Sequence, residues 1–236
     1  MSAKKVIKPS ALFYKLTQVV LFRFYRICFD LKFYGAANVP NDSRGVIFAP
    51  NHASYLDPPM VGITLEKPIH YLAKDYLFKV FALGRMLYWL GSLPIKSEAD
   101  DFRSMRQLLR ALKEGKRMTI FVEGTRSADG NFKEVEGGAG FLAVKSKAHV
   151  VPVYISGSFA AFPKDAKWIR CKPVRLYYGK PFIPCEDAEL MAKENPYMAV
   201  SEKIMAEIKK IKADAENGVY EKQKPNQFCF VRPGAK

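Results

Sequence analysis

The sequence predicts an α/β domain in which helices cover a central mixed β-sheet, with a helical segment at the N-terminus. Three observations support this fold class. The chain has 236 residues, enough for one domain with a sizeable core. Short apolar runs alternate along it with segments of helical spacing, as in a sheet packed against helices. Histidine, carboxylate and arginine side chains directly follow two of these runs, at the sheet edge where such folds tend to bind ligands.

The charge balance implies an anionic partner. Lysine and arginine total 38 against 23 acidic residues, for a formal net charge of +15. Nucleic acid, an anionic bilayer and an anionic substrate all fit that charge. No helix-turn-helix, zinc-finger or RNA-binding sequence pattern is present, so we expect no nucleic acid. The cysteines and histidines lack metal-ligand spacing, so we expect no metal site and reduced thiols at Cys28, Cys171, Cys185 and Cys229.

The N-terminal segment has the composition of a helix that lies at a membrane surface. Between residues 10 and 34, many aromatic and aliphatic side chains alternate with Lys15, Arg23 and Arg26. The longest uncharged run is residues 16–22, far below the roughly 20 residues that cross a bilayer. The pattern therefore predicts a helix in the plane of the interface. The alternative is an amphipathic helix that packs on the core of its own domain.

The organisation that follows has three parts. Residues 1–34 form a membrane-associating helical segment, and residues 35–215 form the catalytic domain. Residues 216–236 form a polar tail, which we expect to be loosely attached.

The first informative motif follows a short buried strand at residues 46–49. His52 and Asp57 lie five positions apart, which on a continuous helix leaves their side chains about 140° apart. They meet only if the chain turns, and Pro50 before them and Pro58 after them favour a turn. Asp57 can then hold one ring nitrogen of His52, which leaves the other free to accept a proton. A structural alternative is that Asp57 caps a helix that begins at Pro58.

A second motif follows the apolar run at residues 118–122. Glu123, Gly124, Thr125 and Arg126 come directly after it. An arginine at the end of a buried strand offers a planar fork of donors that matches phosphate. The structural alternative is a Glu123–Arg126 ion pair that braces the loop.

The remaining elements follow from apolar spacing and from the residues that end each run. A helix begins near Pro59, and His70 lies within a strand. The segment 76–90 is either a second membrane-touching helix or a core helix. We expect strands at 69–73, 150–155 and 174–178, and helices at 59–65, 102–112, 137–147 and 200–213.

Together the two motifs resemble the glycerolipid acyltransferase family, most closely its bacterial 1-acylglycerol-3-phosphate acyltransferases. Residues 51–57 are similar to the first family motif and residues 121–127 to the third, with valine at 122 where proline is usual. Residues 91–96 are similar to the second, with lysine at 96 where arginine is usual, and residues 151–155 to the fourth. The resemblance extends from about residue 33 to residue 179 in the expected order.

One part of the sequence departs from the family. After Asp129-Gly130 the family often has an aromatic-Lys-Lys-Gly run. Here the nearest matches are Phe132-Lys133 and the run 135–138. A lysine that faces phosphate in the family is therefore missing or displaced.

The resemblance implies roles for individual residues. His52 would be the general base and Asp57 the residue that fixes its tautomer, with Asn51 and Ser54 supporting the motif. Glu123, Gly124, Thr125 and Arg126 would bind the acceptor and its phosphate. Lys74 and Lys96 would assist them.

The same resemblance implies an acyltransferase without a bound cofactor or metal. The acyl donor would be acyl-CoA or acyl-ACP (acyl carrier protein), and the acceptor the lysophospholipid 1-acylglycerol-3-phosphate, giving phosphatidic acid. The expected location is the membrane surface on the cytoplasmic face of the inner membrane. Alternatives on the same scaffold are another lysolipid acceptor, a thioesterase and a transacylase. Because no GxSxG sequence is present, we expect direct attack by the acceptor and no acyl-enzyme.

Overall fold

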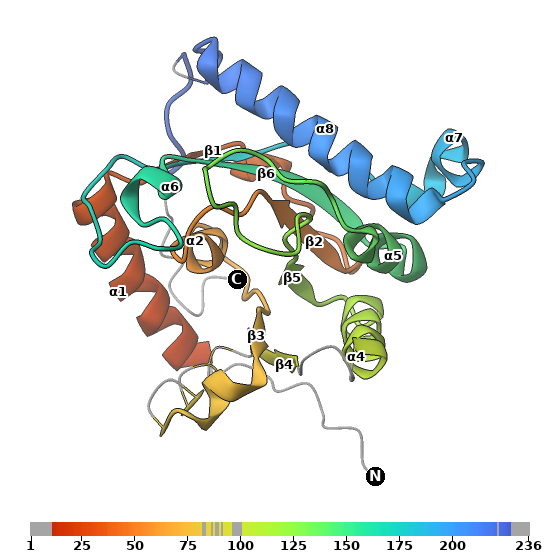
Figure 1. Ribbon diagram of the computed structural model, residues 1–236, viewed down its shortest axis with the longest axis horizontal. Helices are drawn as coiled ribbons and strands as arrows, with labels where there is room; N and C mark the ends of the chain where they lie inside the picture. The colour runs from red at the N-terminus through yellow and green to blue at the C-terminus, as the bar shows by residue number, and fades with distance from the viewer. Residues whose placement is uncertain are drawn as a thin grey trace.

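The central feature of the computed structural model is a five-stranded mixed sheet with helices on both faces (Figure 1). The structure describes residues 11–81, 84, 85, 87, 90, 92–95, 101–220 and 222–227. The strand order is β1-β7-β6-β2-β5, and only the β6–β7 pair is antiparallel. This confirms the predicted fold class. The strands are β1 (Lys32–Tyr34), β2 (Val46–Pro50), β5 (Arg117–Thr119), β6 (His149–Ser156) and β7 (Arg175–Tyr178).

Two hydrophobic clusters cover the two faces of this sheet. One cluster packs α1 (Ala11–Phe29) and α2 (Asp57–Ile63) against it, and the other packs α4 (Asp101–Lys113), α5 (Gly137–Ser146) and α8 (Pro196–Glu216). A separate parallel pair joins β3 (Leu72–Lys74) to β4 (Leu93–Ile95). The shorter elements are α6 (Ser158–Ala161), α7 (Ala188–Met191) and the 3-10 helices η1 (Ala36–Asn38), η2 (Asp75–Lys79) and η4 (Pro184–Glu186).

The register of the sheet places the two motif loops at the same end of the sheet, beyond the carboxyl ends of β2 and β5. Ile47 of β2 lies opposite Met118 of β5, and the two strands run parallel. Their carboxyl ends therefore open on the same side, β2 into residues 51–56 and β5 toward Glu123. Strand β5 ends at Thr119, earlier than expected, although the Ile120 amide still donates to the Phe48 carbonyl at 2.9 Å.

Several helix boundaries differ from those expected. Helix α8 begins at Pro196 and not near residue 200, because the Asn195 side chain caps it by accepting from the Met198 amide at 3.1 Å. Helix α4 stops as predicted before Gly115, whose φ of +77° suits the end of a helix. Of the expected helix at 76–90, only part lies within the described residues, and there Asp75–Lys79 is a 3-10 helix.

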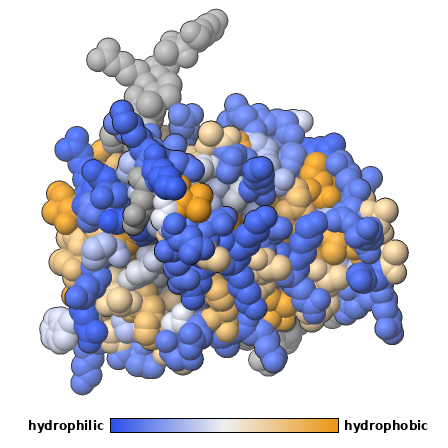
Figure 2. Space-filling model, turned by 90° about the horizontal axis from the view of Figure 1, so that it is seen from above, coloured by the Kyte–Doolittle hydropathy of each residue, from blue (hydrophilic) through white to orange (hydrophobic). Residues whose placement is uncertain are grey.

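The N-terminal helix has two different faces. Tyr14, Tyr25 and Phe29 are buried, and the amide of Gln18 donates to the carbonyls of Gly62 and Leu65 in and after α2. The opposite face exposes large apolar side chains at a spacing of three or four residues, Leu12, Leu16, Val20, Phe24 and Ile27, which we call the α1 stripe. By contrast, the face seen from above, on the side of α8, is largely hydrophilic (Figure 2).

The predicted N-terminal segment is corrected at its end. Helix α1 stops at Phe29, and Lys32–Tyr34 is an edge strand that pairs with β7. None of the helices in the described part of the chain has the length and apolarity that crossing a bilayer requires. Because α1 and β1 contribute to the core, residues 11–34 are part of the folded domain, and the division into three parts stays a prediction about function.

The C-terminal tail is attached more firmly than expected. The Tyr220 ring lies 4.7 Å from that of Tyr177, measured between ring centroids. Further on, the Asn226 amide donates to the Phe33 carbonyl at 2.8 Å, and its side chain accepts from the Ala36 amide. These contacts hold Tyr220 against β7 and Asn226 against β1 and the residues that follow it. The described cysteines, Cys28, Cys171 and Cys185, carry free thiols, and Cys229 lies outside the described residues.

Candidate active site

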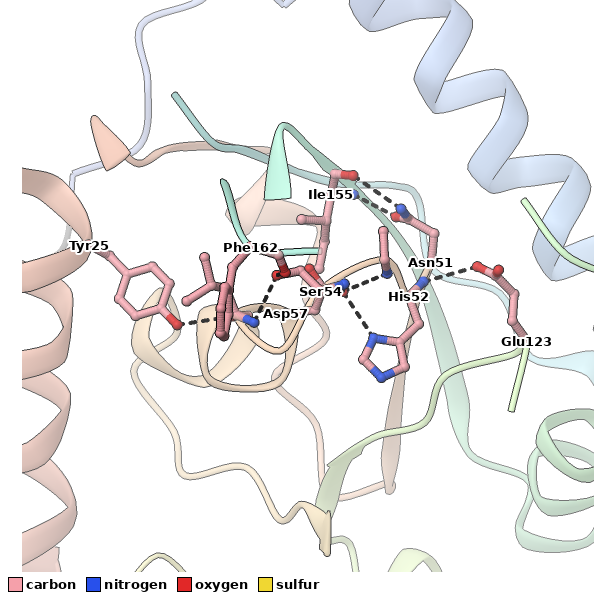
Figure 3. A network of polar contacts seen from close by, with 10 residues as sticks. Tyr25, Asn51, His52, Ser54, Asp57, Glu123, Ile155 and Phe162 are labelled. Carbon is pink, nitrogen blue, oxygen red and sulfur yellow. Dashed lines mark hydrogen bonds and ion pairs between the residues drawn. The ribbon is translucent and has the colours of Figure 1, made fainter. Parts of the chain in front are cut away.

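The turn between β2 and α2 brings His52 and Asp57 together (Figure 3). Nδ1 of His52 lies 2.9 Å from Oδ2 of Asp57. The same oxygen accepts from the backbone amides of Ala53 and Ser54, each at 2.7 Å. The turn thus wraps around one fully buried carboxylate. A carboxylate that only accepts hydrogen bonds places the imidazole proton on Nδ1.

The capping alternative for Asp57 is wrong. Asp57 is itself the first residue of α2, and its side chain accepts from amides that precede the helix. Its other oxygen, Oδ1, is buried without a hydrogen-bond partner among the described residues. A desolvated carboxylate aimed at one imidazole is expensive for a purely structural turn, and it suits a site that develops positive charge on the histidine.

The imidazole of His52 is held flat and leaves one nitrogen open. Its ring stacks on Phe121 with centroids 3.7 Å apart and planes 18° apart. The side chain keeps 13% of its surface exposed, and Nε2 points away from Asp57 (Figure 3). With the proton on Nδ1, Nε2 presents a lone pair to whatever enters the site. This geometry is that of a general base.

Asn51 and Ser54 fix the ends of the turn. Asn51 bonds both backbone groups of Ile155 in β6, donating at 3.1 Å and accepting at 2.8 Å. The Ser54 hydroxyl donates to the Phe162 carbonyl at 2.6 Å and accepts from the Leu56 amide. Both residues therefore position the turn, and their part in catalysis stays a prediction.

Glu123 links the second motif to the first. One carboxylate oxygen accepts from the His52 amide and the other from the Lys133 amide, both at 3.0 Å. The Ser127 amide donates in return to the His52 carbonyl at 2.8 Å. Glu123 accepts from backbone amides and not from Arg126, so the structural alternative of a Glu123–Arg126 brace is wrong. A contact between Glu123 and a bound acceptor stays a prediction.

The burial of Glu123 has a consequence for stability. Burial raises the pKa of this carboxyl above 4.5, against the opposing effect of the two amides. The folded state then binds the proton more tightly than the unfolded state. Its contribution to the free energy of unfolding is fully present below pH 4.5 and is lost as the pH rises through the folded-state pKa.

We therefore expect Glu123→Gln, which cannot titrate, to remove this pH dependence. The free energy of unfolding of the wild type, minus that of the variant, should fall between about pH 4 and about pH 7. Urea denaturation of both proteins measures it. Glu134→Gln, at an exposed neighbouring site, is the control, and its free energy of unfolding should change with pH in the same way as that of the wild type. If the difference in free energy of unfolding between the wild type and Glu123→Gln did not change with pH, burial would not be raising the pKa of this carboxyl.

Gly124 and Thr125 shape the loop. Gly124 has a φ of +67°, and a Cβ there would lie 2.3 Å from a carboxylate oxygen of Glu136. The Gly124 amide donates to the Phe121 carbonyl and the Thr125 amide to the Glu123 carbonyl. These two amides are thus already used inside the loop and are not free to stabilise an oxyanion.

Arg126 carries an unused donor. Its guanidinium carbon lies 3.4 Å from the centroid of the Tyr55 ring, and Nη1 is buried without a hydrogen-bond partner within the described residues. Leaving a buried charged donor unpaired is costly, so an anion is expected to complete it. Sequence reasoning missed Tyr55, although an aromatic residue between His52 and Asp57 is a signal for stacking against a cation.

Lys133 lies in the same loop as Arg126. Its ammonium donates to the Thr125 hydroxyl at 2.5 Å, beside Arg126 in the same loop. Of the lysines predicted to assist, Lys74 ends β3, but its side chain lies outside the described residues, as does the whole of Lys96. Within the described residues, no group of histidine, cysteine and carboxylate side chains has an arrangement that would hold a metal ion.

Comparisons with known proteins agree on one family. The family model described as "Acyltransferase" matches residues 30–156. The chain is similar to a 1-acyl-sn-glycerol-3-phosphate acyltransferase of Bacillus subtilis, at 30% identity over 183 residues that cover 77% of this chain and 87% of the relative. It is also similar to the chloroplastic enzyme LPAT1 of Arabidopsis thaliana, at 27% identity over 179 residues.

That match to LPAT1 covers 75% of this chain but only 49% of the relative, so the chain spans about half the length of its chloroplastic relatives. Among solved structures, the crystal structure of the 1-acyl-sn-glycerophosphate acyltransferase PlsC from Thermotoga maritima matches with a TM-score of 0.64. The identity is 25%, and the match covers 85% of this chain and 78% of the other.

Proposed function

The chain belongs to the acyltransferase family, and from this premise we propose that it transfers a fatty acyl chain from a thioester to 1-acylglycerol-3-phosphate, giving phosphatidic acid. The observation that carries the proposal is the set of hydrogen bonds that connects the two motifs. Glu123 and Ser127 tie the loop of Arg126 to the backbone of His52, so a proton acceptor and an anion site are held together. An acceptor that carries a free hydroxyl near a phosphate, as 1-acylglycerol-3-phosphate does, fits a proton acceptor beside an anion site.

The reaction follows from the orientation of His52. Nε2 removes the proton from the acceptor hydroxyl, and the oxygen attacks the thioester carbonyl carbon. Asp57 stabilises the imidazolium that results, through Nδ1. When the tetrahedral intermediate collapses, the C–S bond breaks, and the thiolate leaves with the proton from Nε2. His52 returns to its starting state, and no cofactor or metal is required in this sequence.

The anion site would hold the acceptor's phosphate. Arg126 offers Nη1, and Lys133 adds a second positive charge from the same loop. The stacked Tyr55 ring keeps the guanidinium plane fixed, which suits a bidentate contact to phosphate.

Membrane association is part of this proposal. The α1 stripe is exposed, and Arg23 and Arg26 on the same helix are exposed beside it. Apolar side chains of this kind enter the acyl boundary while arginines meet lipid phosphates. We place the protein as a peripheral enzyme on the cytoplasmic leaflet of the inner membrane, where its lipid substrate is concentrated.

The direct test is incubation of the protein with a labelled acyl donor and a panel of lysolipids, with identification of the product. Phosphatidic acid formed from 1-acylglycerol-3-phosphate is the expected result. Acyl-CoA and acyl carrier protein thioesters are compared in parallel, since either leaves as a thiolate. Release of fatty acid without any acceptor would indicate a thioesterase, and product from a different lysolipid alone would reassign the acceptor.

A second prediction addresses the anion site. Arg126→Lys keeps the charge but loses the planar fork, so the acceptor KM should rise by about tenfold or more, and more than the donor KM. Steady-state kinetics with each substrate varied in turn measures it. An acceptor KM equal to that of the wild type, in a folded variant, would return Arg126 to a structural role.

Tyr55 supplies the matched comparison. Tyr55→Leu should raise the acceptor KM by several-fold, because the ring face under the guanidinium is lost, whereas Tyr55→Phe should not. In the Arg126→Lys background, Tyr55→Leu should add little, since the stacked plane is already absent. Additive effects of the two substitutions would mean that Tyr55 acts independently of Arg126.

A further inference from the structure

The segment between α6 and β7 holds a tryptophan in solvent. Trp168 is 82% exposed and its neighbour Ile169 is 48% exposed. We call residues 163–173 the Trp168 loop. Exposing one large apolar residue is ordinary, but an exposed tryptophan next to an exposed isoleucine on a loop tip is typical of a contact surface.

This loop is anchored at several points. The Arg170 amide donates to the Ala161 carbonyl at 2.8 Å, and the Ala166 amide to the Pro163 carbonyl at 3.2 Å. Just beyond its end, the Val174 amide donates to the Phe29 carbonyl at 2.9 Å. Backbone hydrogen bonds thus hold the loop against α6 and against the end of α1, and they hold Trp168 outward.

The charges on the loop are nearly all positive. Its sequence contains Lys164, Lys167, Arg170 and Lys172 against a single acid, Asp165. All five side chains are exposed, and the four basic ones form no ion pair with any residue that the structure describes. Unpaired positive charges around an exposed tryptophan suit a partner surface on which anionic groups and apolar groups lie within a few ångströms of each other. The headgroup region of an anionic bilayer is such a surface.

The loop is continuous with the α1 stripe. The Val174 amide, just after the loop, donates to the carbonyl of Phe29, two residues beyond Ile27 at the end of the stripe. In Figure 1 the loop after α6 lies beside the upper end of α1. The two exposed surfaces are therefore neighbours in the fold.

We propose that the Trp168 loop is a second membrane contact, which inserts Trp168 and Ile169 into the headgroup region of an anionic bilayer next to α1. The proposal rests on the membrane association in the proposed function, but it concerns a different segment. The Ser54 hydroxyl, in the turn of His52, donates to the carbonyl of Phe162, the residue before this loop, so the docked loop would lie close to the candidate active site.

The fluorescence of Trp168 tests insertion without any need for activity. The sequence has two tryptophans, and in full-length Trp89→Phe the remaining emission comes from Trp168. With vesicles of phosphatidylglycerol and phosphatidylethanolamine, we expect the emission maximum of Trp168 to shift to the blue. When the lipids are brominated near the carbonyl, we expect the Trp168 emission to be quenched. If Trp89→Phe does not fold, the difference between the wild type and Trp168→Phe gives the same signal.

Sedimentation with the same vesicles measures the contribution to binding. Trp168→Ser should weaken binding by about 3- to 10-fold, because an interfacial aromatic anchor is lost. The matched control is Val219→Ser, at an apolar residue that is 45% exposed in the turn after α8, and it should bind like the wild type.

Three outcomes would overturn the proposal. They are an unshifted Trp168 emission on vesicles that do bind the protein, equal binding by Trp168→Ser, and a shift produced by acyl carrier protein but not by vesicles. The last would assign the loop to a protein partner. Failure of the proposed function looks different, because a protein without acyltransferase activity would still show the vesicle-dependent shift.

Discussion

Replacing His52 by alanine is expected to lower kcat by about 10²- to 10⁴-fold while the protein stays folded. His52 provides the only ring nitrogen that the described residues point into the site, with Nδ1 bound to Asp57 and Nε2 open. Without it, the acceptor hydroxyl has no base and the leaving thiolate no proton donor. The loss should fall on kcat and kcat/KM alike, because the interaction is made in the transition state. Initial rates with saturating substrates measure it.

The chain contains a matched control for this substitution. Nε2 of His149 lies 2.7 Å from Oδ2 of Asp42, a second histidine–carboxylate pair at the other end of the sheet. His149→Ala removes the same chemical group and should leave kcat within a few-fold of the wild type. Near-normal acyl transfer by His52→Ala, or an equal loss in both variants, would contradict the assignment of the base.

The part of the site that the sequence predicted is the part that is local. His52, Asp57 and their supporting residues lie within seven positions, and proline residues on both sides force the turn that joins them. A short apolar strand followed by a turn is enough to place His52 beside Asp57. The chain order of strands and helices likewise predicted the α/β class, since it depends on spacing alone.

Contacts between distant segments could not be predicted in the same way. Nothing local indicates that Arg126 stacks on Tyr55, or that Glu123 accepts from the His52 amide, because these pairs form only when β2 and β5 lie side by side. The three-residue strand β1 was missed for the same reason. Its residues continue the aromatic pattern of α1, and only pairing with β7 makes them a strand.

The two alternatives weighed for the N-terminal helix turn out to be compatible. One face packs on α2 and the other exposes the α1 stripe, so a single helix is both a core element and an apolar surface. Deleting residues 1–34 would remove Tyr25, Phe29 and β1 from the core and is expected to unfold the domain. A test of membrane binding must therefore change the exposed face alone.

Leu12, Leu16, Val20 and Ile27 are between 58% and 84% exposed, so replacing all four by serine should leave the fold intact. Each side chain that enters the acyl boundary contributes about 1 kcal/mol, so the quadruple variant should bind anionic vesicles roughly 10³-fold more weakly. Vesicle sedimentation measures this directly, and far-UV circular dichroism checks the fold.

The accompanying activities separate binding from catalysis. The variant's rate on bilayer-embedded acceptor should fall far more than its rate on a short-chain, water-soluble analogue, because only the first requires the protein at the interface. Arg23→Gln, which alters charge on the same helix, should weaken vesicle binding modestly and only at low salt, since screening removes its contribution. Wild-type binding should survive high salt in part, because the apolar contribution is not screened. Complete release of the wild type by salt, or an equal loss of both activities in the quadruple variant, would mean that the α1 stripe does not hold the enzyme on the membrane.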